Sequence, residues 1–130
     1  MSENRKKVFI VDDEVVNLKI GKNALSNHYD VFPLDSGKAL FDMLRSVQPD
    51  LILLDIMMPE MDGHEALRQL KANKQAANIP VIFLTSKGDI GTVLEGISGG
   101  INDYIVKPFD PAQLLKRIDA QFDKQVEVKY

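Results

Sequence analysis

The chain has 130 residues, 45% of them hydrophobic and 27% charged, which is the usual balance for a single globular domain. It has no cysteine, which excludes disulfides and thiolate metal sites, and its net charge of −3 without a basic stripe argues against direct nucleic-acid binding. No apolar run is long enough to span a membrane and residues 1–7 are polar, so we expect a cytoplasmic protein that inserts in no membrane.

The first part of the chain predicts two strands and two helices. Residues 8–11 are all apolar, as in a parallel strand that is buried on both faces, and a helical pattern follows over roughly 14–27. Residues 31–34 predict a second strand, whose proline suits a sheet edge. Ser36 is the expected N-cap of a second helix over 38–47.

The middle of the chain repeats this order. Residues 51–54 and 81–84 are again continuous apolar runs, so both predict strands buried on two faces. Between them a third helix opens at Asp62, where Glu65 three residues later completes a capping-box pattern with an acidic cap. Strand and helix therefore alternate through the middle of the chain as well.

The last part predicts a weak helix, a strand and a strong helix. Residues 90–101 keep apolar side chains at helical spacing, but five glycines lie in or beside this stretch, and each glycine inside a helix costs about 1 kcal/mol relative to alanine. Residues 104–106 predict the fifth strand. Asp110 and Pro111 mark a cap and first helical position of a fifth helix.

This order is a fivefold (βα) repeat in one domain, residues 1–130, with 123–130 as a tail or the start of a linker. It predicts the α/β class, a doubly wound parallel sheet with helices on both faces and right-handed crossovers. In such sheets ligands bind beyond the carboxyl ends of the strands. The residues at those ends are therefore the candidates for function.

Five side chains with suitable chemistry end four of the five strands. They are Asp12, Asp13, Asp55, Thr85 and Lys107. Clustered carboxylates repel one another, so they need a cation, and oxygen ligands favour Mg²⁺. A metal ion and a lysine beside a carboxylate suit phosphoryl transfer, which depends mainly on positioning and charge neutralisation. Each aspartate alone would more often be a helix cap, but the five together favour a phosphorylation site at Asp55.

The motifs at these ends resemble the receiver domain of bacterial two-component response regulators. The resemblance covers about residues 7–122, and implies a flavodoxin-like sandwich with strand order 2-1-3-4-5. The matching segments are VDDE at 11–14, LDIMMPEMDG at 54–63, LTS at 84–86 and DYIVKPF at 103–109.

The resemblance implies a role for each acidic residue of the site. Asp55 resembles the phosphoacceptor. Asp13 and Asp55 resemble the direct ligands of Mg²⁺, for which Mn²⁺ could substitute, with the backbone carbonyl of Met57 as a third protein ligand. Asp12 resembles the acid that binds the metal through water.

The resemblance also implies how the site switches. Thr85 resembles the hydroxyl that closes onto the phosphoryl group, Lys107 the lysine that pairs with a phosphoryl oxygen, and Tyr104 the aromatic that then swings inward. The peptide between Lys107 and Pro108 is expected to be cis. Ile101 stands where the family usually has alanine, so we expect crowding beneath the fourth helix.

The function implied is that of a phosphoacceptor that catalyses only its own phosphorylation and dephosphorylation. The expected partners are a sensor histidine kinase or phosphotransfer protein as donor, and an output domain or target protein that reads the surface of the fourth helix, fifth strand and fifth helix. A phosphorylation-dependent homodimer is a further partner that the resemblance allows.

Three rival functions stay open. An aspartate-nucleophile phosphatase would need an acid two residues after Asp55, where Met57 stands. A nucleotide- or flavin-binding module would need a glycine-rich or hydroxyl-rich loop after the first strand, where acidic residues 12–14 stand. A degenerate receiver would bind its partners without phosphorylation.

Overall fold

The computed structural model describes residues 5–86 and 90–127 of the chain. Its centre is a parallel sheet with the strand order β2-β1-β3-β4-β5, as the sequence predicts. The strands are β1 (Lys7–Val11), β2 (Asp30–Leu34), β3 (Leu51–Asp55), β4 (Val81–Ser86) and β5 (Asp103–Lys107).

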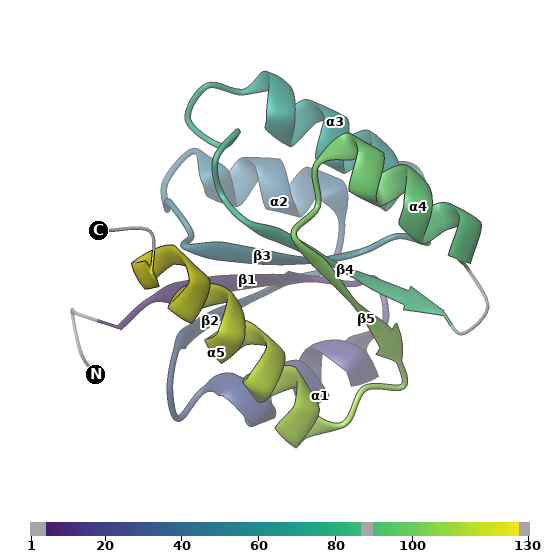
Figure 1. Ribbon diagram of the computed structural model, residues 1–130. Coiled ribbons are helices and arrows are strands. Elements are labelled where there is room, and N and C mark those ends of the chain that lie inside the picture. The colour runs from purple at the N-terminus through teal and green to yellow at the C-terminus, as the bar shows by residue number, and fades with distance from the viewer. Residues whose placement is uncertain (1–4, 87–89, 128–130) are drawn as a thin grey trace.

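The helices cover the sheet on both faces. In Figure 1, α2, α3 and α4 lie on one face, and α1 and α5 lie on the other. The helices are α1 (Val15–Leu25), α2 (Gly37–Leu44), α3 (Gly63–Ala72), α4 (Ile90–Gly99) and α5 (Pro111–Glu127). Within the described ranges, no helix combines the length and the apolarity that crossing a membrane requires.

The continuous apolar runs fold this way because each strand contributes to two cores. In β1, Phe9 and Val11 join the core under α2, α3 and α4, whereas Val8 and Ile10 join the core under α1 and α5. Side chains alternate between the faces of a strand, so a strand covered on both faces must be apolar throughout. In this way the sequence pattern determines a sandwich of three layers.

Side-chain caps set the starts of three helices at the predicted residues. Ser36, Asp62 and Asp110 each accept a hydrogen bond from the backbone N–H three residues later, at 3.0, 2.9 and 3.2 Å. The predicted end of the second helix at residue 47 is wrong, since α2 ends at Leu44. Arg45 and Ser46 donate their N–H groups three residues back, which tightens the last turn.

Two further boundaries differ from the expected ones. The first helix is shorter than the range 14–27, because it starts at Val15 and ends at Leu25. The last helix is longer, because α5 runs through Glu127 and so includes residues 123–127, which the sequence suggested as a tail or linker. Residues 128–130 of that tail lie outside the described part of the chain.

The expected crowding by Ile101 is resolved by a glycine in α4. A Cβ atom on Gly96 would lie 2.5 Å from Cε2 of the buried Phe83 ring and 3.0 Å from Cδ1 of Ile101. The absent side chain therefore makes the space that Ile101 and Phe83 fill. In contrast, a Cβ on Gly91 of the same helix would meet no neighbouring heavy atom within 4 Å among the described residues.

These two glycines allow a matched stability test. We expect Gly91→Ala to raise the free energy of unfolding by about 0.5–1 kcal/mol, since alanine is the better helix former and the site is open. Gly96→Ala should lower it by about 1–2 kcal/mol, because overpacking against Phe83 exceeds the same helical gain. Urea unfolding of both variants measures the difference, and equal effects of the two would contradict the packing argument.

Candidate functional site

Four charged side chains meet at the carboxyl ends of the central strands. Asp12 and Asp13 follow β1, Asp55 ends β3 and Lys107 ends β5. One carboxylate oxygen from each of the three aspartates lies within 4.8 Å of the others. Asp12 and Asp55 are buried, whereas Asp13 is exposed, so the group opens to solvent on one side. We call the three aspartates Asp12, Asp13 and Asp55 the acidic rim.

Lys107 connects the two buried carboxylates of the acidic rim. Its Nζ atom lies 3.0 Å from Oδ1 of Asp55 and 3.2 Å from Oδ2 of Asp12, and its side chain is only 14% exposed. The peptide between Lys107 and Pro108 is cis, as predicted. Since the ends of β1, β3 and β5 each contribute a charge to the same small volume, the parallel topology itself builds the site.

The electrostatics of the acidic rim are unbalanced. Burial raises the pKa of Asp55 from 3.8 to about 6, with the charge of Asp12 adding to the rise and Lys107 opposing it. Burial acts to lower the pKa of Lys107, but the hydrogen bond and charge of Asp55, together with Asp12, outweigh it and raise that pKa. One ammonium therefore does not fully compensate the carboxylates, and a second cation would be stabilised there.

The donor set of the acidic rim fits Mg²⁺. All its ligand atoms are carboxylate oxygens, which a hard divalent cation prefers, and the exposed side at Asp13 leaves room for water ligands. Burial is the main cause of the raised pKa of Asp55, but the charge of Asp12 adds to it, and a bound cation would offset that repulsion. Asp12, Asp13 and Asp55 are the residues that could hold the ion.

The loop after β3 folds closely around Asp55. The N–H of Met57 donates to Oδ1 of Asp55 at 3.4 Å, and the N–H of Gly63 donates to the carbonyl of Ile56 at 2.8 Å. A Cβ on Gly63 would lie 2.7 Å from the carbonyl oxygen of Asp55 and from Cα of Ile56, so α3 can start this close only with glycine. The side chain of Met57 is 67% exposed.

The two remaining predicted residues lie on the strands next to the acidic rim. Thr85 is buried, and its hydroxyl donates to the carbonyl of Ser86 at 3.3 Å. Phe83 is in register with Tyr104, and Thr85 lies two residues further along β4. Because alternate residues of a strand face the same side, Thr85 and Tyr104 share one face of the sheet. Tyr104 is 39% exposed.

Sequence reasoning missed one contact of the acidic rim. Oε1 of the exposed Glu14 lies 4.0 Å from Nζ of Lys107 and accepts a hydrogen bond from Nδ2 of Asn17 at 3.2 Å. The sequence shows Glu14 directly after the two aspartates, but the first turn of α1 determines where its side chain goes. Glu14 therefore adds negative charge on the outer side of Lys107.

Comparisons with known proteins agree with this geometry. Residues 8–119 match the model of the response regulator receiver domain family. The chain is 36% identical over 119 residues to the ycf27 transcriptional regulator of Cyanophora paradoxa, and 33% identical over 122 residues to the DNA-binding response regulator MtrA of Mycobacterium tuberculosis. These alignments cover 91% and 93% of the chain but 48% and 52% of the relatives.

A solved structure gives the same result for the fold. The chemotaxis response regulator CheY4 of Vibrio cholerae superposes with a TM-score of 0.84 at 27% identity, covering 90% of this chain and 98% of that one. The chain thus spans nearly all of this receiver structure and about half the length of the ycf27 and MtrA relatives. With the strand order, the acidic rim and the family match in agreement, the chain belongs to the receiver domain family of two-component response regulators.

Proposed function

We propose that this chain is the phosphoacceptor domain of a two-component system and that Asp55 takes the phosphoryl group. The observation that carries the proposal is the contact of a buried carboxylate with Lys107 at 3.0 Å, inside a cluster of three aspartates. The donor is a phosphohistidine on a sensor kinase or phosphotransfer protein, or a small phosphodonor. The site of action is the cytoplasm.

In the proposed reaction, a carboxylate oxygen of Asp55 attacks phosphorus while the bond from phosphorus to the donor's histidine nitrogen breaks. The imidazole leaves with the electron pair, and Asp55 becomes an acyl phosphate. Lys107 pairs with a phosphoryl oxygen. Asp13 and Asp55, with the backbone carbonyl of Met57, would hold the cation directly, and Asp12 would hold it through water. When bound, Mg²⁺ neutralises phosphoryl charge and holds the group in place. Hydrolysis of the acyl phosphate then returns Asp55 to its free state.

In the proposed switch, the phosphoryl group at Asp55 changes a distant part of the protein surface through Thr85 and Tyr104. The added group has about two negative charges and strong acceptor oxygens, which attract the hydroxyl of Thr85. Tyr104, on the same face of the sheet, fills the space that Thr85 vacates. The surface made by α4, β5 and α5 then changes shape.

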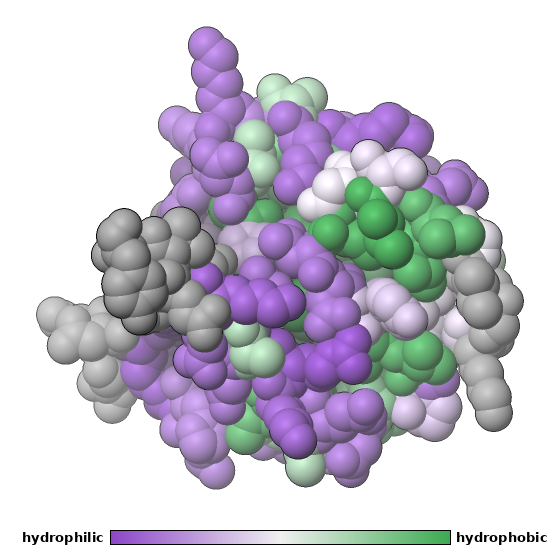
Figure 2. Space-filling model, in the orientation of Figure 1, coloured by the Kyte–Doolittle hydropathy of each residue, from purple (hydrophilic) through white to green (hydrophobic). Residues whose placement is uncertain are grey.

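That surface already exposes apolar side chains. Leu94 and Ile97 on α4 and Tyr104 and Val106 on β5 are exposed, and Figure 2 shows apolar residues gathered over α4 and the end of β5. Exposed apolar side chains gathered in this way suit a protein partner. We propose an output domain, a target protein or a second phosphorylated copy as that partner. The ycf27 and MtrA relatives are about twice as long as this chain, and MtrA is named a DNA-binding regulator.

Uptake of phosphate from a small phosphodonor tests the proposal. We expect incubation with acetyl phosphate and Mg²⁺ to add one phosphoryl group, and a metal chelator to slow the uptake by a hundredfold or more, on the order of what one charge-neutralising group contributes to such reactions. Intact-protein mass spectrometry measures the product, and peptide mapping after reduction of the acyl phosphate locates it. Labelling at another residue, or none, would refute the assignment.

The same reagents separate the rival functions. A phosphatase would hydrolyse a phosphate monoester repeatedly, and we expect no appreciable turnover because Met57 cannot transfer a proton. A degenerate receiver would show no uptake, yet would bind its partner equally well with or without the phosphodonor. Turnover of a monoester by the wild type but not by Asp55→Asn would favour the phosphatase instead.

A further inference from the structure

Side chains contact the main chain along the outer edge of β5. β5 is the last strand of the sheet, so its outward N–H and C=O groups have no strand partner in the described sheet. At Tyr104 these groups are satisfied by side chains instead. The N–H of Tyr104 donates to Oδ1 of Asp103 at 2.8 Å, and the carbonyl of Tyr104 accepts from Nη2 of Arg117 at 2.8 Å.

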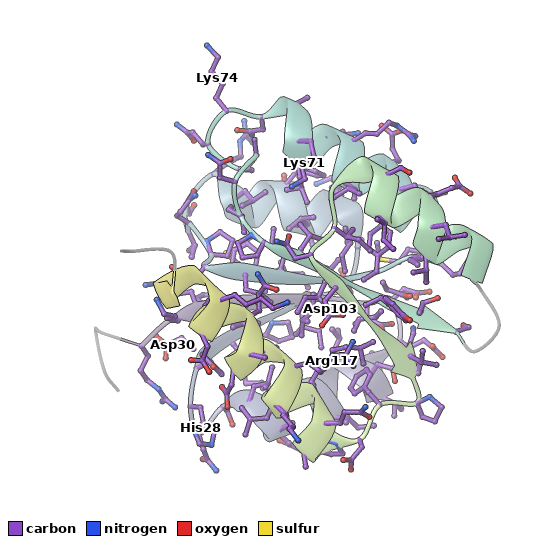
Figure 3. The ribbon with its side chains drawn as sticks, in the orientation of Figure 1. His28, Asp30, Lys71, Lys74, Asp103 and Arg117 are labelled. Atoms are coloured by element: carbon purple, nitrogen blue, oxygen red, sulfur yellow. The ribbon has the colours of Figure 1, made fainter. Side chains whose placement is uncertain are left out.

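The two side chains that hold Tyr104 are paired with each other. Arg117 of α5 donates from Nε to Oδ2 of Asp103 at 2.9 Å and from Nη2 to Oδ1 at 2.7 Å, which is a bidentate pair. Figure 3 shows Asp103 on β5 and Arg117 on α5 pointing toward one another. We call the pair, with its two hydrogen bonds to Tyr104, the edge clamp.

The edge clamp is a partly buried, ionised unit. Burial acts to raise the pKa of Asp103, but the hydrogen bonds from Arg117 and from the Tyr104 amide outweigh burial and hold that pKa below its usual value. The pair is therefore charged at neutral pH. A planar guanidinium can serve two carboxylate oxygens and a carbonyl at once, which an ammonium cannot do with the same geometry.

We propose that Asp103 and Arg117 are positioning residues for the switch: they fix the main chain of Tyr104, so that its response to phosphorylation is a rotation of the side chain alone. The proposal rests on the proposed function, because it assigns a role to the residue expected to report on Asp55. Its physical basis is that Arg117 of α5 binds both the carbonyl of Tyr104 and the carboxylate that accepts the Tyr104 N–H, so the main chain at this edge residue is tied to the helix. The aromatic ring then turns between two defined positions.

Hydrogen exchange of the Tyr104 amide tests the edge clamp independently of phosphorylation. In Arg117→Ala we expect the Tyr104 amide to exchange about tenfold faster, since Asp103 loses the partner that orients it, while amides of the central strand β3 keep their rates. Arg117→Lys should restore part of the protection, because one donor can still reach Asp103. Unchanged exchange at Tyr104 in Arg117→Ala would overturn the clamp.

The role in switching is measured with beryllofluoride and Mg²⁺ as the acyl-phosphate mimic. The fluorine NMR resonance of fluorotyrosine at position 104 is assigned by its loss in Tyr104→Phe. In the wild type, beryllofluoride and Mg²⁺ should shift this resonance to a second position. In Arg117→Ala we expect less than about half of that displacement, with the affinity for beryllofluoride within about threefold of wild type because Arg117 does not touch Asp55. A full displacement would overturn the positioning role.

Two further variants serve as controls. Lys38→Ala removes an exposed ion pair with Asp42 on α2, and it should leave both the exchange rate of the Tyr104 amide and the shift of the fluorotyrosine resonance at wild-type values. Asp103→Ala removes both the acceptor of the Tyr104 amide and the ion pair, and it should behave as Arg117→Ala does, so it serves if that variant does not fold. If the wild-type protein does not bind beryllofluoride, the proposed function is refuted. The exchange rate of the Tyr104 amide would still decide whether the edge clamp exists.

Discussion

The Asp55→Asn protein should take up no phosphoryl group and, without divalent cations at neutral pH, should be more stable than the wild type by roughly 2–3 kcal/mol. The loss of uptake follows from removal of the attacking carboxylate. The gain in stability follows from the raised pKa of Asp55, about 6 in the folded chain against 3.8 ordinarily, since ionising this group costs more in the folded state. Denaturant unfolding with a chelator present measures the gain.

The pH dependence of that gain identifies its source. Well below pH 3.8 Asp55 is protonated in both the folded and unfolded chains, so its charge costs nothing. As the pH rises from about 4 to 6 the unfolded chain ionises first, and the wild type loses stability relative to Asp55→Asn until the folded group also ionises. The difference between the two proteins should therefore grow over this window and stay constant above it.

Mg²⁺ supplies the control for this experiment. Because a cation that binds only the folded acidic rim stabilises it by mass action, added Mg²⁺ should raise the stability of the wild type more than that of Asp55→Asn and so reduce the gap between them. A stability difference that is independent of pH, or one that Mg²⁺ leaves unchanged, would show that Asp55 is not charged in excess at this site.

Lys107→Met is expected to have the largest destabilising effect of any single change at the acidic rim. Methionine keeps much of the length and apolar contact of lysine but leaves the buried carboxylates of Asp12 and Asp55 without their ammonium partner, 3.2 and 3.0 Å away. Breaking a buried pair from one side costs about 3–5 kcal/mol, so we expect a loss of that order at pH 7 without metal. Phosphoryl uptake should fall by about a hundredfold or more.

A second lysine provides the matched control for charge removal. Lys38 forms an exposed pair with Asp42 at 2.9 Å on α2, and Lys38→Met should leave stability and phosphoryl uptake unchanged. The double variant with Lys107→Met and Asp55→Asn should recover stability relative to Lys107→Met alone, because one unpaired carboxylate is gone. The gain from Asp55→Asn should be larger in the Lys107→Met background than in the wild type, and equal gains in the two backgrounds would contradict an ion pair between residues 55 and 107.

The layers of this fold and the members of the acidic rim were predictable from the sequence for one physical reason. A strand buried on both faces must be apolar throughout, so the runs at residues 8–11, 51–54 and 81–84 mark the central strands directly. A parallel sheet then brings the residue after each run to one edge. Asp12 and Asp55 follow two of these runs and Lys107 follows the predicted strand at 104–106, so the three side chains meet at that edge.

Features that depend on contacts between distant elements were not predictable in this way. Asp103 and Arg117 are fourteen residues apart on a strand and a helix, and no local pattern marks them as partners of Tyr104. Helix ends depend on competition between hydrogen bonds in the last turn, which is why the second helix ended earlier than its apolar pattern suggested.

The shared space at Gly96, Ile101 and Phe83 has a consequence for protein engineering. The side chain of Ile101 fills space that a Cβ atom at residue 96 would need. The residues at the two positions therefore cannot be chosen independently. A chimera that takes α4 from a receiver with a larger residue at position 96 must also take a smaller residue at position 101. The segment from Gly96 to Ile101 should therefore be exchanged between such domains only as one block.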